Sequence, residues 1–330
     1  MRQSISNQGF YCLIKRTASR KSNKNKFIYG PVPSRRLGYS LGIDIIPFKT
    51  CPYNCIYCQL GRTTTQTIKR KKYIHKEKIL AELKEILKHR AKIDFITFSG
   101  SGEPTLNTDI KDLINEIKKI TNIPIAVITN SSLLFKPEVQ KSLLNADVVM
   151  PTLTTINNDT FKKIHRPTPP ITVKKVIDGL LKFRKIYKGK IYLEFMLIKG
   201  FNDSKEEIMG LKDVIKRIKP DKIQLNTVVR PPNEKCARAL TLKELRKIKK
   251  IMGRKCEIIA EFKKEKNILK TNGYANLIIQ YLKRRPGTQK DIGKSLGINQ
   301  SEVVKYLFDL LKAKKIKKRV YGGEIFYERI

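Results

Sequence analysis

One stretch of the sequence, Cys51-Pro52-Tyr53-Asn54-Cys55-Ile56-Tyr57-Cys58, places three cysteines within eight residues. This spacing suits a single tight loop wrapped around a four-iron, four-sulfur cluster, because thiolate is the soft ligand that such irons prefer. Pro52 and Asn54 favour the turns that the loop needs. Three thiolates also leave one iron open to a small chelating ligand. The predicted metal ligands are therefore Cys51, Cys55 and Cys58.

A zinc site is the main alternative for these cysteines. Closed zinc sites usually take four ligands and pair one C-x-x-C motif with a second, distant pair, which this sequence lacks. His75 or His89 could supply a fourth ligand, and unligated core cysteines are a third reading. The other cysteines, Cys12, Cys236 and Cys256, are scattered along the chain.

The rest of the chain alternates short β-type runs with amphipathic helical stretches, which is typical of βα units in a largely parallel sheet. The predicted strands are residues 43–46, 95–99, 125–129, 148–152, 191–197 and 223–228, and the predicted helices are residues 78–88, 110–120, 137–144, 173–186, 205–218 and 240–252. Six such units fit an α/β fold, either a partial (β/α)6 barrel or an open sheet. Chemistry is then expected at the carboxyl ends of the strands, where the cysteine loop, residues 99–104, Asn130 and residues 151–155 would share one face.

The pattern changes near the C-terminus. Three short helices, at residues 275–283, 289–296 and 302–311, precede two β-type runs around Tyr321-Gly322-Gly323-Glu324. This order predicts a winged helix-turn-helix, with the third helix capped by Asn299 or Ser301. A chain of 330 residues also exceeds the usual size of a single core. The predicted division is a basic, disordered tail at residues 1–26, a catalytic domain at residues 27–260 and a winged-helix domain at residues 261–330.

The charge is strongly positive: 70 Lys and Arg stand against 29 Asp and Glu, a net charge of +41. Such a field attracts polyanions, and nucleic acid is the natural candidate, although much of the charge could belong to solvated helix surfaces. No apolar run approaches the roughly 18 residues that cross a bilayer, so no membrane contact is expected. Cysteines without a secretory signal indicate a reducing compartment, and we expect a cytoplasmic protein.

The cysteine motif resembles the signature of the radical S-adenosylmethionine (SAM) superfamily, including the aromatic Tyr57 before the last cysteine. The resemblance continues through Ser99-Gly-Ser-Gly-Glu-Pro104, Thr129-Asn130-Ser131 and Pro151-Thr152, and so covers roughly residues 41–229. It implies a partial (β/α)6 barrel of the radical SAM type. Two departures stand out: Ser101 replaces a common second glycine, and residues 151–155 lack an acidic residue.

This resemblance implies specific cofactors and contacts. Cys51, Cys55 and Cys58 would hold a [4Fe-4S] cluster whose open iron takes the amino and carboxylate groups of SAM, and an electron donor such as flavodoxin or ferredoxin would reduce it. The implied SAM contacts are Tyr57 at the adenine, Gly100, Ser101, Gly102 and Glu103 at the methionyl end, and Asn130 and Thr152 at the ribose or methionyl groups. Glu194 and Gly200 could reach the adenine. Reductive cleavage of SAM would give a 5′-deoxyadenosyl radical.

The segment from Gly30 to Gly42, with Gln59-Leu-Gly-Arg62, resembles a subgroup related to the wyosine-type tRNA-modifying synthases. Those synthases hold a second cluster with upstream cysteines, but only Cys12 lies upstream here. Arg35, Arg36 and Arg62 would suit a phosphate or carboxylate, unless they pair with acidic residues of their own domain.

Two hypotheses of function follow. The first is a radical SAM enzyme that modifies RNA, such as tRNA, or another anionic substrate recruited by the winged helix. The second is a cluster-bearing, DNA-binding redox regulator. The glycine-rich loop and the βα units favour the enzyme, because a sensor needs no nucleotide site.

Overall fold

The computed structural model describes residues 27–88, 92–260, 274–298 and 300–330. The predicted tail at residues 1–26, with Cys12, lies outside these residues. His89 and the predicted cap Asn299 lie outside them too, and so does the start of the predicted winged-helix domain, residues 261–273.

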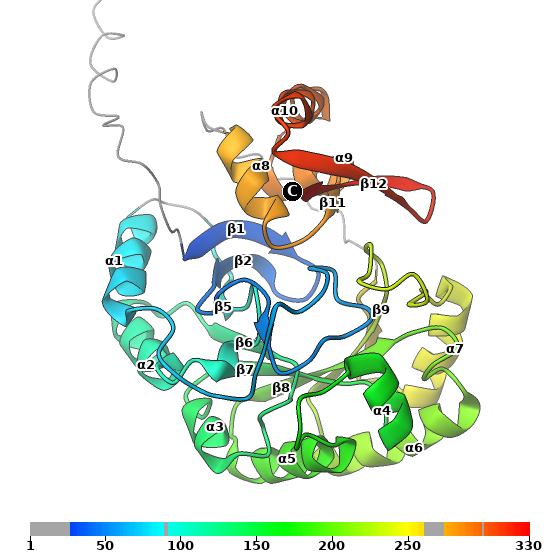
Figure 1. Ribbon diagram of the computed structural model, residues 1–330. Helices are drawn as coiled ribbons and strands as arrows, with labels where there is room; N and C mark the ends of the chain where they lie inside the picture. The colour runs from blue at the N-terminus through cyan, green and yellow to red at the C-terminus, as the bar shows by residue number, and fades with distance from the viewer. Residues whose placement is uncertain (1–26, 89–91, 261–273, 299) are drawn as a thin grey trace, which may run out of the picture.

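A mostly parallel sheet of eight strands forms the main body (Figure 1). Only the first pair is antiparallel; every later neighbour runs parallel. In spatial order the strands are β1 (Ile28–Ser34), β2 (Gly38–Ile43), β5 (Phe95–Phe98), β6 (Ile125–Thr129), β7 (Val148–Leu153), β8 (Lys190–Leu197), β9 (Lys222–Thr227) and β10 (Cys256–Ile258). The parallel register brings the carboxyl ends of β2, β5, β6 and β7 to the same edge, which confirms the predicted shared face.

Helices follow the outer side of the curved sheet in Figure 1. They are α1 (Lys76–Leu87), α2 (Ile110–Ile120), α3 (Pro137–Ser142), α5 (Val173–Ile186), α6 (Lys205–Ile218) and α7 (Leu242–Met252). The short helix α4 (Asn158–His165) lies inside this ring, with its end at the cysteine loop. Apolar positions at helical spacing, such as Leu113 and Ile117 of α2, are fully buried against apolar strand residues such as Ile96 and Val127. Among the described residues, no helix is both long enough and apolar enough to span a bilayer.

The prediction of a first strand at residues 43–46 is wrong, since β2 ends at Ile43, and β1 was not predicted at all. Gly30 and two prolines interrupt the strand pattern of β1, and Gly38 and Gly42 weaken that of β2. The structure gives a packing reason for one glycine: a Cβ on Gly42 would lie 2.1 Å from Cζ of the Tyr29 ring. The strands β5 to β9 and the helices α1, α2, α3, α5, α6 and α7 were predicted to within two residues at their ends, whereas α4 and β10 were missed.

The described residues from 274 onward, which we call the C-terminal unit, have a hydrophobic cluster of their own around Ile278, Ile292 and Leu307. Their elements are α8 (Tyr274–Leu282), β11 (Gly287–Thr288), α9 (Gln289–Leu296), α10 (Gln300–Lys312), β12 (Ile316–Tyr321) and β13 (Glu324–Arg329). The strands form an antiparallel sheet in the order β11-β13-β12. The unit sits over β1 (Figure 1).

Candidate functional site

The cysteine loop is closed at its base by two short strands, β3 (Thr50–Cys51) and β4 (Thr65–Gln66), which pair in parallel. Within it, the Asn54 side chain accepts a hydrogen bond from the Thr63 backbone N–H at 3.0 Å, and the Thr63 hydroxyl donates to the Tyr53 carbonyl at 2.7 Å. Tyr53 itself is fully buried. The loop is therefore a fixed structure in which the turn residues hold one another.

The C-terminal end of α4 supports the same loop. The backbone N–H groups of Asn54 and Ile56 donate to the carbonyls of His165 and Ile164, each at 2.9 Å. These carbonyls belong to the last turn of α4, where helix carbonyls lack intrahelical partners. The Thr168 hydroxyl, just beyond the helix, donates to the Pro52 carbonyl at 2.8 Å. The loop and the helix end thus satisfy each other's backbone groups.

Each of the three sulfur atoms has a polar neighbour. The contacts are Lys49 Nζ to Cys58 Sγ at 3.2 Å, Asn130 Nδ2 to Cys51 Sγ at 3.2 Å, and His165 Nδ1 to Cys55 Sγ at 3.1 Å. Burial raises the pKa of the Cys51 thiol to about 12 and that of the Cys55 thiol well above its usual value. Buried thiols of this kind need a positive centre to become thiolates, which a bound metal supplies.

The donor set fits a cluster better than a single ion. In the described part of the chain, no three His, Cys, Asp or Glu side chains converge on one metal-ion position. A four-iron cluster binds each thiolate to a different iron, so its ligands need not converge on one point. His75, weighed as a zinc ligand, is exposed at the start of α1. The histidine beside the cysteines is His165, which sequence reasoning missed.

His165 is buried among aromatic rings. Its ring centroid lies 4.7 Å from that of Tyr53 and 4.9 Å from that of Phe161. Burial lowers its pKa to about 3, so the ring is neutral near pH 7. Its Nε2 lies 2.7 Å from the Thr154 hydroxyl. The sequence signal for its helix was Asn157, whose side chain accepts from the backbone N–H groups of Asp159 and Thr160 as an N-cap.

The glycine-rich loop after β5 packs tightly against its neighbours. A Cβ on Gly102 would lie 2.1 Å from the Thr50 carbonyl oxygen, and one on Gly100, at φ +147°, would lie 2.5 Å from Asp44 Cγ. The Ser101 hydroxyl donates to Asp44 at 2.5 Å, and its carbonyl accepts from the Lys49 backbone N–H at 2.7 Å. The glycines therefore let this loop lie directly against the residues that lead into Cys51.

Glu103 is 2% exposed, and its carboxylate accepts hydrogen bonds from neighbouring protein groups. Its Oε1 accepts from the backbone N–H and hydroxyl of Thr105 and from the Thr129 hydroxyl, and its Oε2 accepts from the Asn130 N–H at 2.8 Å. Burial raises its pKa, and these hydrogen bonds oppose the rise. Glu103 thus ties the glycine-rich loop to the end of β6; its contact with a SAM group stays a prediction.

Thr152 and Glu194 form a buried pair on neighbouring strands. The Thr152 hydroxyl donates to Glu194 Oε2 at 2.7 Å, Asn226 donates to Oε1 at 2.8 Å, and Arg36 forms an ion pair with the same carboxylate. Burial alone would raise the pKa of Glu194, but Arg36 and these hydrogen bonds outweigh burial and lower it. A carboxylate of β8 therefore lies directly beside Thr152 on β7.

One cavity of about 1580 Å³ unites the site. Every predicted site residue lines it: Cys51, Tyr57, Cys55, Cys58, Gly100, Ser101, Gly102, Glu103, Asn130 and Thr152. Glu194, Arg35 and Arg36 line it too, whereas Arg62 and Gly200 do not. Arg62, which was expected to suit a phosphate or carboxylate together with Arg35 and Arg36, is exposed outside this lining.

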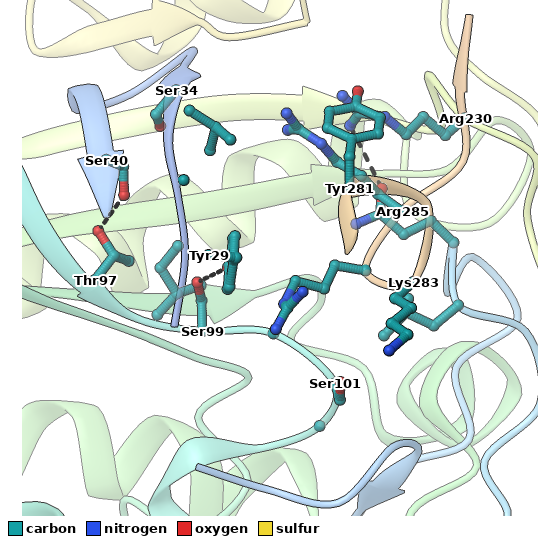
Figure 2. A pocket seen from close by; sticks show the side chains of 18 of the residues that line it. Tyr29, Ser34, Ser40, Thr97, Ser99, Ser101, Arg230, Tyr281, Lys283 and Arg285 are labelled. Atoms are coloured by element: carbon teal, nitrogen blue, oxygen red, sulfur yellow. Dashed lines mark hydrogen bonds between the residues drawn. The ribbon is translucent and has the colours of Figure 1, made fainter. Parts of the chain in front are cut away.

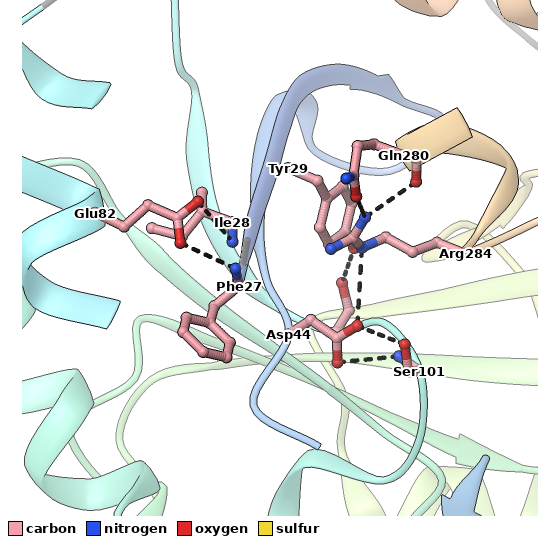
Figure 3. A network of polar contacts seen from close by, with 9 residues as sticks. Phe27, Ile28, Tyr29, Asp44, Glu82, Ser101, Gln280 and Arg284 are labelled. Atoms are coloured by element: carbon pink, nitrogen blue, oxygen red, sulfur yellow. Dashed lines mark hydrogen bonds and ion pairs between the residues drawn. The ribbon is translucent and has the colours of Figure 1, made fainter. Parts of the chain in front are cut away.

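The C-terminal unit also reaches this cavity, through the end of α8 and the residues after it. Arg284 lies 3.8 Å from Asp44, which holds Ser101, and its guanidinium stacks 4.0 Å from the centre of the Tyr29 ring (Figure 3). The Tyr29 hydroxyl in turn lies 2.8 Å from the Ser99 hydroxyl (Figure 2). Arg284 therefore joins the C-terminal unit to the glycine-rich loop, a contact that sequence reasoning missed.

Comparisons with known proteins agree with this geometry. A family model described as "Radical SAM superfamily" matches residues 45–211. A protein of Brachyspira hyodysenteriae named GTPase Obg is 42% identical over 96% of this chain, but the chain spans only 47% of that protein. The solved structure of Streptococcus suis SuiB bound to precursor peptide SuiA aligns over 75% of this chain and 52% of that one, with a TM-score of 0.50 and 17% identity, a likeness of fold alone.

A UPF0026 protein of Methanocaldococcus jannaschii is similar along almost its whole length, being 33% identical over 91% of this chain and 94% of that protein. The family model covers the cysteine loop, the glycine-rich loop and the ends of β5, β6, β7 and β8, all of which line the cavity. The chain belongs to the radical SAM superfamily and is a relative of the UPF0026 proteins.

Proposed function

We propose that this protein is a radical SAM enzyme in which Cys51, Cys55 and Cys58 hold a [4Fe-4S] cluster. The observation that carries the proposal is that the cysteine loop and the glycine-rich loop face the same cavity, beside the carboxyl ends of parallel strands. When bound, the cluster would supply one electron that breaks a sulfonium carbon–sulfur bond of SAM, giving methionine and a 5′-deoxyadenosyl radical that would take a hydrogen atom from the substrate. The redox-regulator alternative finds no support in the comparisons.

The surrounding residues would orient SAM and keep water away from it. Tyr57 forms an aromatic wall of the cavity next to the cysteines, where an adenine ring could stack. Gly100, Ser101 and Gly102 line the cavity and would meet the amino group of SAM. Asn130 and Thr152, held by Glu103 and Glu194, would meet its ribose or methionyl groups.

Anaerobic reconstitution followed by reduction with dithionite tests this proposal. We expect about four irons per chain, a broad absorption band near 400 nm in the oxidised protein, and 5′-deoxyadenosine when SAM is added. A colourless protein that binds one zinc ion and forms no 5′-deoxyadenosine would refute it.

For the substrate we propose RNA or another anionic molecule, with the chain in the subgroup related to the wyosine-type tRNA-modifying synthases and without a second cluster. The cavity supports an anionic substrate, because seven Arg and Lys side chains line it against four Glu side chains. An electron donor such as flavodoxin or ferredoxin would reduce the enzyme in the cytoplasm.

We also propose that residues 27–260 form the catalytic domain and residues 261–330 a winged-helix domain that binds nucleic acid. Three helices, a three-stranded antiparallel sheet and a separate hydrophobic cluster support the division. Lys317 and Lys318 on β12 are exposed and could contact phosphates. Replacing both with Gln should lower tRNA affinity and flatten its salt dependence by about two units of slope, since a phosphate that is no longer neutralised keeps its counterion. Equal slopes would exclude this strand as the contact surface.

A further inference from the structure

Three arginines from distant parts of the chain meet in the cavity beside the cysteine loop. Arg35 follows β1, Arg230 follows β9, and Arg285 follows α8 in the C-terminal unit. Figure 2 shows Arg230 and Arg285 side by side next to Tyr281. The pKa of Arg35 is lowered to about 9, first by burial and then by the positive charges of Arg230, Arg36 and Arg285, and Glu194 opposes this lowering. The three side chains therefore form one cationic group, which we call the arginine cluster.

Neutral groups contact two members of the cluster. Arg230 Nη1 donates to the Gln59 side chain at 3.4 Å, Arg285 Nη2 donates to the Ser295 hydroxyl at 3.3 Å, and the Arg285 guanidinium lies 4.5 Å from the centre of the Tyr281 ring. Gln59 directly follows Cys58, so the cluster is anchored to the cysteine loop itself.

Two carboxylates act on the cluster: Asp291, in the first turn of α9, on Arg230, and Glu194 on Arg35. They are fewer than the guanidinium groups around them, which are those of the cluster and of Arg36. Glu194 accepts from Arg36, Thr152 and Asn226, and Asp44 pairs with Arg284 and holds Ser101. Like charges held together in a half-buried site repel one another, and a ligand with two negative charges would relieve that repulsion. A phosphate group carries about −1.5 to −2 charges at neutral pH and three acceptor oxygens. The planar guanidinium groups match the geometry of a phosphate. A ligand carboxylate, with one negative charge, would balance less of the positive charge.

We propose that the arginine cluster binds a phosphate group of the substrate, with Arg285 supplied by the C-terminal unit. This inference rests on the proposed function for the identity of the reaction, but the binding itself requires no SAM cleavage. It gives the C-terminal unit a direct part in the active cavity, since the phosphate site is complete only when that unit is docked. The phosphate belongs either to a small phosphorylated molecule or to a nucleic-acid backbone.

The test measures equilibrium binding by calorimetry on the full-length, anaerobically reconstituted protein, with inorganic phosphate, adenosine 5′-monophosphate and tRNA as probes. We expect Arg285→Gln to weaken phosphate binding about tenfold or more, the loss expected for a charge-assisted contact. Arg285→Lys should give an intermediate affinity, because it keeps the charge and loses the fork. The matched control is Arg246→Gln on the exposed face of α7, which removes one charge outside the cavity and should change nothing.

The probes separate the sources of the phosphate. Arg285-dependent binding of tRNA that is much tighter than that of the mononucleotide identifies a nucleic acid, and comparable affinities identify a small substrate. Equal phosphate binding by wild type and Arg285→Gln overturns the proposal. So does competition between phosphate and SAM, which would assign the cluster to the SAM carboxylate. Formation of 5′-deoxyadenosine by the wild type is scored separately, so failure of the proposed function is not confused with failure of this site.

Discussion

The cysteine loop and the C-terminal unit line the same cavity, but they reach it by different physical routes. The loop is built from eight consecutive residues, which hydrogen-bond to one another and to the end of α4. The C-terminal unit has its own hydrophobic cluster and brings charged side chains, Arg284 and Arg285, to the cavity from more than 200 residues further along the chain. The cysteine loop is thus a local motif, whereas Arg284 and Arg285 reach the cavity because the C-terminal unit packs against the sheet. Substitutions in the two regions should have distinct effects.

The largest effect is expected in the loop. Cys55→Ala should abolish cluster assembly and 5′-deoxyadenosine formation, because two thiolates and an open iron do not hold a cubane in place. The control is Cys236→Ala, since Cys236 is exposed and does not line the cavity. Iron content and the absorption near 400 nm measure the result. A Cys55→Ala protein that keeps its iron would remove this cysteine from the ligand set.

Arg284→Gln tests the docked half. It breaks the contact with Asp44 and the stacking on Tyr29, and leaves the Asp44 carboxylate buried with only Ser101 as a side-chain partner. Loss of one member of a buried pair should lower the free energy of unfolding by about 3 kcal/mol. SAM affinity should fall as well, because Asp44 positions the glycine-rich loop.

Urea unfolding and SAM binding measure the two effects of Arg284→Gln. Lys290→Gln is the control, since Lys290 is exposed on α9 and its loss removes the same charge. Unfolding curves that coincide with the wild type would show that the contact does not join the two regions.

The same contrast explains what could be predicted from sequence. The metal ligands and the glycine-rich loop follow from the spacing of consecutive residues, and most strands and helices follow from apolar periodicity. The Arg36–Glu194 pair joins residues 158 positions apart, and the arginine cluster joins three separate segments. Such pairings depend on how strands order in the sheet and on how the C-terminal unit docks, neither of which local patterns encode. His165 was missed because its helix, α4, is short and has too few apolar residues to give a clear helical pattern.

Glu194→Gln tests a pairing within the sheet. The pKa of Glu194 lies below its usual value in the folded protein, so its charge stabilises the fold above the unfolded pKa, near 4.3, and this contribution is lost as pH falls through the folded pKa. We expect the variant to be less stable at pH 7 by about 2 kcal/mol, with a difference that narrows below about pH 4.

Unfolding midpoints from pH 3 to pH 8 measure this dependence. Glu234→Gln is the matched control, because Glu234 pairs with Arg166 in solvent and should contribute less than about 1 kcal/mol. A difference between wild type and Glu194→Gln that does not change with pH would contradict the lowered pKa.

The smallest effect is expected at His165, which tunes the loop rather than building it. The neutral ring satisfies both its polar contacts when Thr154 donates to Nε2 and the Nδ1–H donates to Cys55 Sγ. A donor to sulfur stabilises the more negative, reduced cluster, so His165→Phe should make the reduction potential more negative by about 40 mV, the equivalent of one hydrogen bond of about 1 kcal/mol in a one-electron couple. Phe keeps the aromatic packing against Tyr53, so the cluster should still assemble.

The control is Thr154→Val, which leaves His165 Nδ1 beside the Cys55 sulfur and should shift the reduction potential less. Potentiometric titration followed by electron paramagnetic resonance measures both variants, and an unchanged potential in His165→Phe would mean that the ring does not donate to the cluster-bound sulfur.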